Sequence, residues 1–279
     1  MGSDDEAAAV SRRQFLGTTV GAVIASAPAR HEARIMTTAQ PSPARTPVKA
    51  LVFDVFGTVV DWRTSVAAEV EAVASRQGKT IDGPAFADAW RAQYAPSMNR
   101  VRTGELPWTT LDRLHRMSLD TLLPKYGLSG LSEAETAALN KAWHRLRPWP
   151  DTVAGLTRLK RGFIIAPLSN GNIALMTDMA KHSGLPWDCI LGAELVRHYK
   201  PDPVVYQSAA DFLDLKRDEV MMVAAHLGDL RAAKKEGLRT AFVSRPLEFG
   251  PNGKPDLKGD SSVDMSATDF NDLARQLGA

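Results

Sequence analysis

The sequence predicts an α/β protein: a doubly wound, mainly parallel sheet of the Rossmann-like kind, with an inserted helical cap domain. Three observations predict this fold. Short apolar runs alternate with helical stretches, polar residues follow three of these runs, and about a hundred residues of helical character separate the first run from the second. At about 150 residues per domain, 279 residues fit one large domain or a domain with an insert.

Composition excludes several classes of protein. The 34 Lys and Arg residues and 32 Asp and Glu residues leave a net charge of +2, which gives no support to nucleic-acid binding. One cysteine, Cys189, excludes an intrachain disulfide and a multi-thiolate metal site. The six histidines show no HxH or HxxxH spacing, so we expect no histidine-based metal centre.

The first 29 residues resemble a twin-arginine export signal. Arg12 and Arg13 precede a weakly apolar run, 18–29, which closes with the small residues of Ala27-Pro28-Ala29. The run is too short and too mild to hold a helix across about 30 Å of hydrocarbon, so we expect no stable membrane span. The prediction is transient contact with export machinery and a periplasmic or secreted location. The alternative is a disordered terminus that is basic by chance.

Residues 30–47 are predicted to be a linker, because the Pro and small polar residues of 40–47 cannot bury a core. The α/β core domain is predicted over residues 48–64 and 150–279, and the helical cap domain over residues 65–149. A chain that is exported already folded does not depend on disulfides, so a single cysteine agrees with an oxidising destination.

Four apolar runs are predicted to be buried strands, with helices between them. The strands are Val48–Phe53, Phe163–Leu168, Val220–Ala225 and Thr240–Val243, and the helices are Thr152–Arg161, Ile173–Ser183, Pro203–Leu213 and Leu230–Glu236. Ligands of such sheets bind at the carboxyl ends of the strands. Because polar residues follow three of the runs at that end, we expect the functional site there.

The stretch from Asp61 to Pro150 is longer than a crossover between strands requires. Apolar residues recur in it at helical spacing, as in Val66, Val70, Val73 and Leu111, Leu114, Met117. Four tryptophans of this stretch, Trp90, Trp108, Trp143 and Trp149, are interpreted as packing residues rather than as part of a cofactor site. We therefore predict a helical cap and no cofactor.

The segment Phe53-Asp54-Val55-Phe56-Gly57-Thr58 places a carboxylate at the end of the first strand. Gly57 allows the backbone to turn sharply beside Asp54. The segment resembles the nucleophile motif of the haloacid dehalogenase superfamily, and the resemblance extends from Val48 to about Asp269. It implies that Asp54 is a nucleophile; the alternative is that Asp54 only caps the following turn.

Two departures from the superfamily pattern argue against a magnesium-dependent phosphatase, the commonest activity in that superfamily. Such phosphatases carry a second Asp two residues after the nucleophile, which protonates the leaving alkoxide; here that residue is Phe56. A departing halide needs no proton. The phosphatases also place a metal-binding carboxylate where this chain has Ala225, four residues before Asp229. With the oxygen ligands depleted, we predict no metal.

The remaining matches resemble the type II (S)-2-haloacid dehalogenases. In that family the serine matching Ser169 holds the substrate carboxylate, and the asparagine matching Asn170 helps to cradle the halide. Arg91 looks like the cap arginine that receives the halide. Val55 and Phe56, next to the nucleophile, are also expected to contact the substrate.

The resemblance also implies three catalytic residues besides Asp54, namely Lys200, Thr58 and Asp229, and one further substrate-binding residue, Tyr206. Lys200 matches the lysine that holds and neutralises the nucleophilic aspartate, and Thr58 matches a hydroxyl that hydrogen-bonds near it. Tyr206 matches an active-site tyrosine. Asp229 matches the residue that positions or activates the hydrolytic water.

Each residue has a simpler alternative. Lys200 and Arg91 are alternatively solvated charges, Tyr206 a packing residue, Ser169-Asn170 a turn, and Asp229 the N-cap of the helix after it. His226 departs from the family pattern. It is a candidate to bind the intermediate, assist the water or contact the halide, with an ordinary pKa near 6.5; the alternative is a loop histidine bonded to backbone.

The sequence thus predicts a metal-independent hydrolase that converts short (S)-2-haloalkanoic acids to (R)-2-hydroxy acids and halide through an aspartyl ester on Asp54. Its partners are then the small-molecule 2-haloacid and the halide. Dimers are common in the family that it resembles, so a homodimer is an open expectation. The alternatives are a magnesium-dependent phosphatase of the same superfamily and a non-catalytic module that binds small carboxylates.

Overall fold

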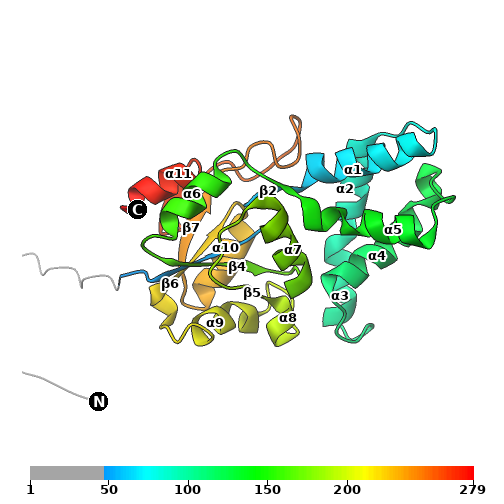
Figure 1. Cartoon of the computed structure of the whole chain (residues 1–279). Coiled ribbons are helices and arrows are strands. Elements are labelled where there is room, and N and C mark those ends of the chain that lie inside the picture. The colour runs from blue at the N-terminus through cyan, green and yellow to red at the C-terminus, as the bar shows by residue number, and fades with distance from the viewer. Residues whose placement is uncertain (1–46) are drawn as a thin grey trace, which may run out of the picture. The chain divides into compact units, whose positions relative to one another are not determined.

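A six-stranded parallel sheet forms the centre of residues 47–279, the part of the chain that the computed structural model describes (Figure 1). In spatial order its strands are β5 (Leu191–Gly192), β4 (Ile164–Ser169), β1 (Ala50–Phe53), β6 (Val220–Ala224), β7 (Arg239–Val243) and β8 (Met265–Ala267). Every neighbouring pair is parallel, and Ala50 lies opposite Ile164 on one side and Val220 on the other. The predicted fold class is confirmed. The predicted export signal, 1–29, and residues 30–46 of the predicted linker lie outside the described residues.

Helices cover both faces of the sheet because the strands are apolar on both faces. Side chains of a strand alternate between the faces, and all four residues of β1 are fully buried. Leu51 and Phe53 pack with α6 (Thr152–Leu159), α7 (Ile173–Ser183) and α11 (Phe270–Gln276), whereas Ala50 and Val52 pack with α9 (Pro203–Asp211) and α10 (Leu227–Lys235). Figure 1 shows α6 and α11 on one side of the sheet and α9 on the other. The short helices α8 (Ala193–Val196) and η3 (Arg217–Glu219) complete the core.

Two strands of the six-stranded sheet were not predicted, and helix α10 begins earlier than predicted. Strands β5 and β8 have two and three residues, too few to form an apolar run. Helix α10 begins at Leu227 rather than Leu230, because the Leu227 N–H donates to Asp256 Oδ2 at 2.9 Å, a partner that lies 29 residues away. Asp229 therefore lies in the first turn of α10 and is not its N-cap, so that alternative was wrong.

The cap lies between two short strands that pair with each other. Strand β2 (Val60–Asp61) runs antiparallel to β3 (Arg147–Pro148). Between them the chain forms a set of helices: α1 (Trp62–Arg76), α2 (Gly83–Ala92), α3 (Tyr94–Arg102), α4 (Leu111–Leu122), η1 (Pro124–Tyr126), α5 (Glu133–Asn140) and η2 (Lys141–Arg145). Figure 1 shows α1 to α5 grouped beside the sheet. The division of the chain at residues 64/65 and 149/150 stays a prediction.

Tryptophans pack at the base of the cap. Trp62, Trp90 and Trp143 are fully buried, and the ring centroids of Trp90 and Trp143 are 5.5 Å apart. Trp108 and Trp149 are only half-buried, and the Trp149 indole donates to the Gly57 carbonyl at 2.9 Å. Among the residues interpreted as a helical apolar face, Met117 is 39% exposed, because it lies on the solvent side of α4. The bond from Trp149 to Gly57 thus joins the end of the cap segment to the turn after β1.

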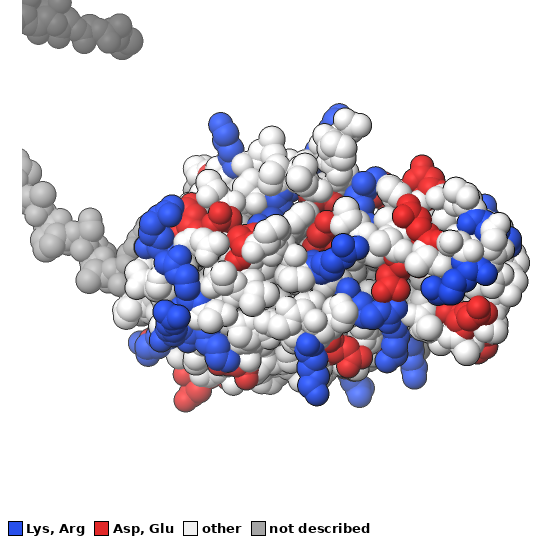
Figure 2. Space-filling view, turned by 45° about the horizontal axis from the view of Figure 1, so that its top comes forward, with Lys and Arg blue, Asp and Glu red and all other residues white. Residues whose placement is uncertain are grey.

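Figure 2 shows Lys and Arg side chains interspersed with Asp and Glu over the face in view. The mixture of signs agrees with the small net charge of +2. Among residues 47–279, we find no helix of the length and apolar character that crossing a membrane requires.

The close approach of α6 to α11 provides a test of the packing. A Cβ on Gly155 would lie 2.4 Å from Phe270 Cβ and 2.8 Å from its carbonyl carbon. Gly155→Ala gains about 1 kcal/mol of helix propensity, but overpacking against fixed backbone costs about 1–3 kcal/mol. We expect net destabilisation, measured by urea unfolding. Gly162→Ala, where no heavy atom lies within 4 Å of the added Cβ, is the matched control; equal stability of the two variants would contradict the close packing.

Candidate active site

A pocket of about 320 Å³ lies between the carboxyl ends of the strands and the cap. Loops after β1, β4 and β6 and the segment before α9 supply one side, and the cap helices α2 and α3 supply the other. Its lining residues are Asp54, Phe56, Arg91, Tyr94, Asn170, Lys200, Pro201, His226, Gly228 and Asp229. The pocket therefore brings together residues that the sequence analysis chose from five separate segments.

Asp54 follows β1 directly, and its backbone N–H continues the sheet by donating to the Val223 carbonyl at 3.0 Å. The carboxylate is held at both oxygens. Lys200 Nζ donates to Oδ1 at 3.0 Å, Thr58 Oγ1 donates to Oδ2 at 2.7 Å, and His226 Nδ1 lies 3.0 Å from Oδ2. Burial by itself raises the pKa of Asp54, but Lys200, His226 and Thr58 outweigh it and hold that pKa well below its usual range. Asp54 is therefore ionised.

Lys200 is buried, with 8% of the residue exposed, and is not a solvated loop charge. Its ammonium group lies between two carboxylates, 3.0 Å from Asp54 Oδ1 and 2.6 Å from Asp229 Oδ2. Burial lowers the pKa of Lys200, but the two carboxylates raise it above its ordinary value. Its backbone is also held: the N–H donates to Asn170 Oδ1 at 2.7 Å, and the carbonyl accepts from Arg102 Nη2 at 3.2 Å. The lysine is thus fixed from both core and cap.

Asp229 is positioned from two directions. Oδ2 accepts from Lys200, and Oδ1 accepts from the Tyr206 hydroxyl at 2.6 Å. Tyr206 is fully buried on α9, so it packs in the core and also reaches the site. Burial and the Asp229 charge raise the pKa of Tyr206 above its ordinary value, so its phenol stays a hydrogen-bond donor.

His226 lies between Asp54 and a residue that the sequence analysis missed. Its Nε2 lies 2.9 Å from Oε2 of Glu248, which is 1% exposed. Burial lowers the pKa of His226, but the bonds to Asp54 and Glu248 raise it to about 10. The expectation of a titration near 6.5 was therefore wrong, as was the alternative of a histidine bonded to backbone. A signal for Glu248 existed, because it closely follows the fourth apolar run at the carboxyl edge of the sheet.

The loop after β7 also supports the turn that carries Asp54. Gly57 has φ +89°, and a Cβ there would lie 2.1 Å from Glu248 Oε1, so this position requires glycine. Arg245 Nε donates to the Thr58 carbonyl at 2.8 Å, and its guanidinium pairs with Asp151 at 2.7 Å. The conformation of the turn that carries Asp54 thus depends on the loop after β7, which lies almost 190 residues further along the chain.

The cap contributes a cation and aromatic rings. The Arg91 guanidinium carbon lies 4.0 Å from the ring centroid of Tyr94 and 5.9 Å from that of Phe56. Arg91 Nη1 is buried and has no hydrogen-bond partner within residues 47–279. Tyr94, three residues after Arg91, was not predicted; its side chain is hydrogen-bonded to Asn170, and burial raises its pKa. An unpaired buried donor beside the pocket is suited to an anion.

Four predicted residues do not line the pocket. Val55 is fully buried in the apolar core. Ser169 is also fully buried, and its Oγ accepts from the Gly171 N–H at 3.1 Å, which stabilises the turn after β4. Thr58 and Tyr206 reach the site only by hydrogen-bonding to the side chains of Asp54 and Asp229. The structure thus gives Val55 no side-chain contact with the pocket, because it points to the opposite side of the turn from Asp54.

The side chains at this edge do not fit a magnesium site. Phe56 and Ala225 offer no ligand atoms where the superfamily phosphatases have carboxylates, and Mg²⁺ requires several oxygens in octahedral geometry. Between Asp54 and Asp229 lies the Lys200 ammonium group. Within the described residues, no three His, Cys, Asp or Glu side chains are grouped to hold a metal ion.

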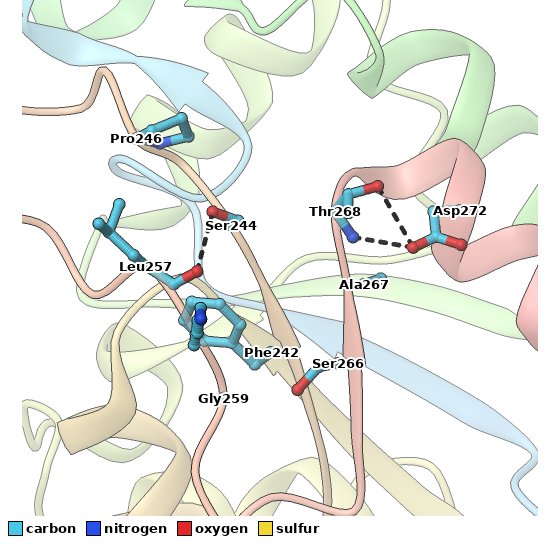
Figure 3. Close-up of a pocket in the computed structure, with 10 residues that line it drawn as sticks. Phe242, Ser244, Pro246, Leu257, Gly259, Ser266, Ala267, Thr268 and Asp272 are labelled. Carbon is cyan, nitrogen blue, oxygen red and sulfur yellow. Dashed lines mark hydrogen bonds between the residues drawn. The ribbon is translucent and has the colours of Figure 1, made fainter.

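A second hollow, of about 540 Å³, lies where β7 and β8 end (Figure 3). Its polar groups bond to one another: Ser244 Oγ donates to the Leu257 carbonyl at 3.4 Å, and Thr268 N donates to Asp272 Oδ2 at 2.9 Å. Its exposed lining is mostly apolar, and these bonds occupy the Ser244 hydroxyl and one oxygen of Asp272.

The fold and the pocket together define a capped α/β enzyme. The chain belongs to the haloacid dehalogenase-like hydrolase family, whose model matches residues 48–237. It is 32% identical over 212 residues to (S)-2-haloacid dehalogenase 1 of Pseudomonas sp. (strain CBS-3), which covers 73% of this chain and 88% of that protein.

Solved structures give closer matches. The defluorinating L-2-haloacid dehalogenase Rha0230 is 51% identical, with a TM-score of 0.81 over 83% of this chain and 96% of that one. The L-2-haloacid dehalogenase PA0810 is also 51% identical, with a TM-score of 0.78 over 82% of this chain and 99% of that one.

The charge on His226 makes stability depend on pH. Its pKa is raised in the folded state, so its contribution is complete below the unfolded value of about 6.5 and is lost as the pH rises through about 10. We expect the free energy of unfolding to fall between those values, and to fall less in His226→Gln. Urea unfolding at a series of pH values measures this. The exposed His182→Gln is the control; identical pH profiles for all three proteins would contradict the charge assignment.

Proposed function

We propose that this protein hydrolyses short (S)-2-haloalkanoic acids to (R)-2-hydroxy acids and halide, through an ester on Asp54 and without a metal ion. The observation that carries the proposal is an ionised Asp54 at a capped pocket, held by Lys200, with Phe56 where a phosphatase has its acid. The identities of 32% to a curated (S)-2-haloacid dehalogenase and 51% to two solved L-2-haloacid dehalogenases support it.

In the first step a carboxylate oxygen of Asp54 attacks C2 of the substrate from the side opposite the halogen. The C–halogen bond breaks, its electron pair leaves with the halide, and C2 is inverted. A carboxylate is a weak nucleophile in water, so burial under the cap and the bond to Lys200 present it desolvated and aimed. The unpaired nitrogen of Arg91 and the side chain of Asn170 are the donors proposed to receive the halide.

In the second step water attacks the carbonyl carbon of the ester, which is Cγ of Asp54. Asp229 lines the same pocket and accepts the proton of that water; Tyr206 and Lys200 hold it in position. The bond between Cγ and the substrate oxygen breaks, so C2 keeps its inverted configuration. An (S)-2-haloacid therefore gives an (R)-2-hydroxy acid.

The leaving groups are proposed to include fluoride. One of the two relatives at 51% identity is described as a defluorinating enzyme. Fluoride accepts hydrogen bonds more strongly than the other halides. The buried Arg91 guanidinium N–H, which has no partner in the described part of the chain, is a donor of the kind that fluoride requires.

The first test is halide release from (S)-2-chloropropionate and from fluoroacetate. We expect the wild type to release halide with and without EDTA, and Asp54→Ala to lose activity by several orders of magnitude, because the nucleophile is gone. In a single turnover in H₂¹⁸O the label is expected in Asp54, not in the hydroxy acid. Ion chromatography and peptide mass spectrometry measure these outcomes.

Four results would contradict the proposal or its mechanism. Loss of halide release in EDTA, or turnover of p-nitrophenyl phosphate instead of haloacids, would indicate a magnesium-dependent phosphatase. Binding of small carboxylates without halide release would indicate a non-catalytic binding module. Label that entered the hydroxy acid directly would exclude the ester.

We further propose that residues 1–29 direct export by the twin-arginine route to the periplasm. The support is the pair Arg12-Arg13 before the mild apolar run 18–29, together with the single cysteine, Cys189, which is free.

Export depends on the arginine pair in this proposal. We expect a fusion of residues 1–47 to a reporter that is active only after folded export to reach the periplasm. The double change Arg12→Lys and Arg13→Lys should abolish this, because the receptor reads the arginine pair rather than the charge. Fractionation of the cells and reporter activity measure it. Export that survives the double change would exclude this route.

A further inference from the structure

We propose that His226, held as a charged donor by Glu248, stabilises the oxyanion that forms on Asp54 Oδ2 during ester hydrolysis, and that Oδ1 is the oxygen that attacks the substrate. This inference rests on the proposed function, since it concerns the two steps of that reaction. It gives Glu248 the role of a positioning residue.

The hydrogen bonds of Asp54 distinguish its two oxygens. Each carboxylate oxygen has about two acceptor positions. Oδ2 meets two donors, Thr58 Oγ1 at 2.7 Å and His226 Nδ1 at 3.0 Å, so both of its positions are occupied. Within residues 47–279, Oδ1 accepts from one side chain, Lys200, whose Nζ lies 3.0 Å away. The remaining lone pair on Oδ1 is therefore the one that can form the bond to C2.

The same bonds then serve the second step. With Oδ1 in the ester linkage, Oδ2 becomes the carbonyl oxygen. When the water oxygen bonds to Cγ, the π electron pair moves onto Oδ2, and the water proton passes to Asp229. Thr58 and His226 already point at the oxygen where this charge develops. The electron pair on Oδ2 then re-forms the C=O bond, the bond from Cγ to Oδ1 breaks, and the leaving oxygen takes the proton back from Asp229. The second proton of the water leaves the regenerated Asp54 carboxyl group for solvent.

Geometry shows why His226 is a donor and not the base for the water. Its Nδ1 faces Asp54 Oδ2, and its Nε2 lies 3.0 and 2.9 Å from the two oxygens of Glu248. A ring with a carboxylate at each nitrogen carries both protons and has no free lone pair. The bonds to the two carboxylates raise the pKa of His226 to about 10, in agreement.

The position of the Glu248 side chain is fixed by burial and by its contacts. It is 1% exposed, its Oε1 accepts from the Trp62 indole at 3.2 Å, and its carboxylate lies against Gly57 of the nucleophile turn. It faces the ring from the side opposite Asp54. Because the Glu248 carboxylate is buried beside the ring, it keeps the positive charge on His226, next to Oδ2, even after Asp54 has become a neutral ester.

Rapid-quench kinetics with (S)-2-chloropropionate separate the two steps. The variants are Glu248→Gln and His226→Gln. Glu133→Gln is the matched control, because Glu133 is an exposed carboxylate on α5 and does not line the pocket. We expect both site variants to release the first chloride at a rate within about threefold of the wild type. We expect ester hydrolysis to slow by about 10²–10³-fold in His226→Gln, as for loss of one oxyanion donor, and by about tenfold in Glu248→Gln.

The supporting result is a burst of one chloride per enzyme, followed by slow turnover, with the ester trapped on the Asp54 peptide. In Glu248→Gln the fall in hydrolysis at high pH should also move to lower pH, which a merely structural role would not cause. The groups that face the ring are Asp54 and Glu248, and Lys200 bonds to the other oxygen of Asp54.

Several outcomes would overturn the inference. Equal slowing of chloride release and ester hydrolysis in the site variants would do so, as would unchanged hydrolysis in His226→Gln. If Glu248→Gln does not fold, His226→Gln decides alone. A wild type that released no chloride would contradict the proposed function itself, and with it this inference.

Discussion

Five charged side chains form an alternating row along the carboxyl edge of the sheet, and the rest of the site depends on their mutual neutralisation. The order is Asp229, Lys200, Asp54, His226 and Glu248, with successive distances of 2.6, 3.0, 3.0 and 2.9 Å. A buried charge without a partner costs several kcal/mol or changes its protonation state. In this row each acidic side chain lies beside a basic one, so opposite charges compensate along its length.

The row also explains how a carboxylate remains ionised in a pocket that excludes water. Burial alone raises the pKa of Asp54, but the cations on both sides of it lower that pKa by more. The nucleophile is thus desolvated and charged at the same time. When Asp54 becomes an ester, its negative charge leaves with the halide, and Lys200 and His226 remain paired with Asp229 and Glu248.

The cap is coupled to this row and does more than cover it. Arg102 on α3 donates to the backbone carbonyl of Lys200, and Arg91 on α2 brings an unpaired guanidinium nitrogen close to Phe56 and Tyr94. Halide is an anion that appears only as the reaction proceeds. A donor that waits in place needs no reorganisation when the charge arrives.

The sequence by itself determined the sheet, the cap and the positions of Asp54, Asn170, Lys200 and Asp229. Apolar runs in the sequence predict buried strands, and the polar residues that follow these runs predict where the active site lies. It did not determine the short edge strands, nor the start of α10, whose first turn is held by Asp256.

Tertiary structure alone decided the partners of His226. Nothing local to His226 indicates that Glu248, in the loop after another strand, would meet its second nitrogen. That contact raises the pKa of His226 instead of leaving it near 6.5. Likewise, the direction in which a turn points its side chains placed Val55 in the core and Asp54 in the pocket. The sequence predicts local secondary structure and which segments are buried. The charge state of a side chain and the direction in which it points depend on contacts between segments that are distant in the sequence.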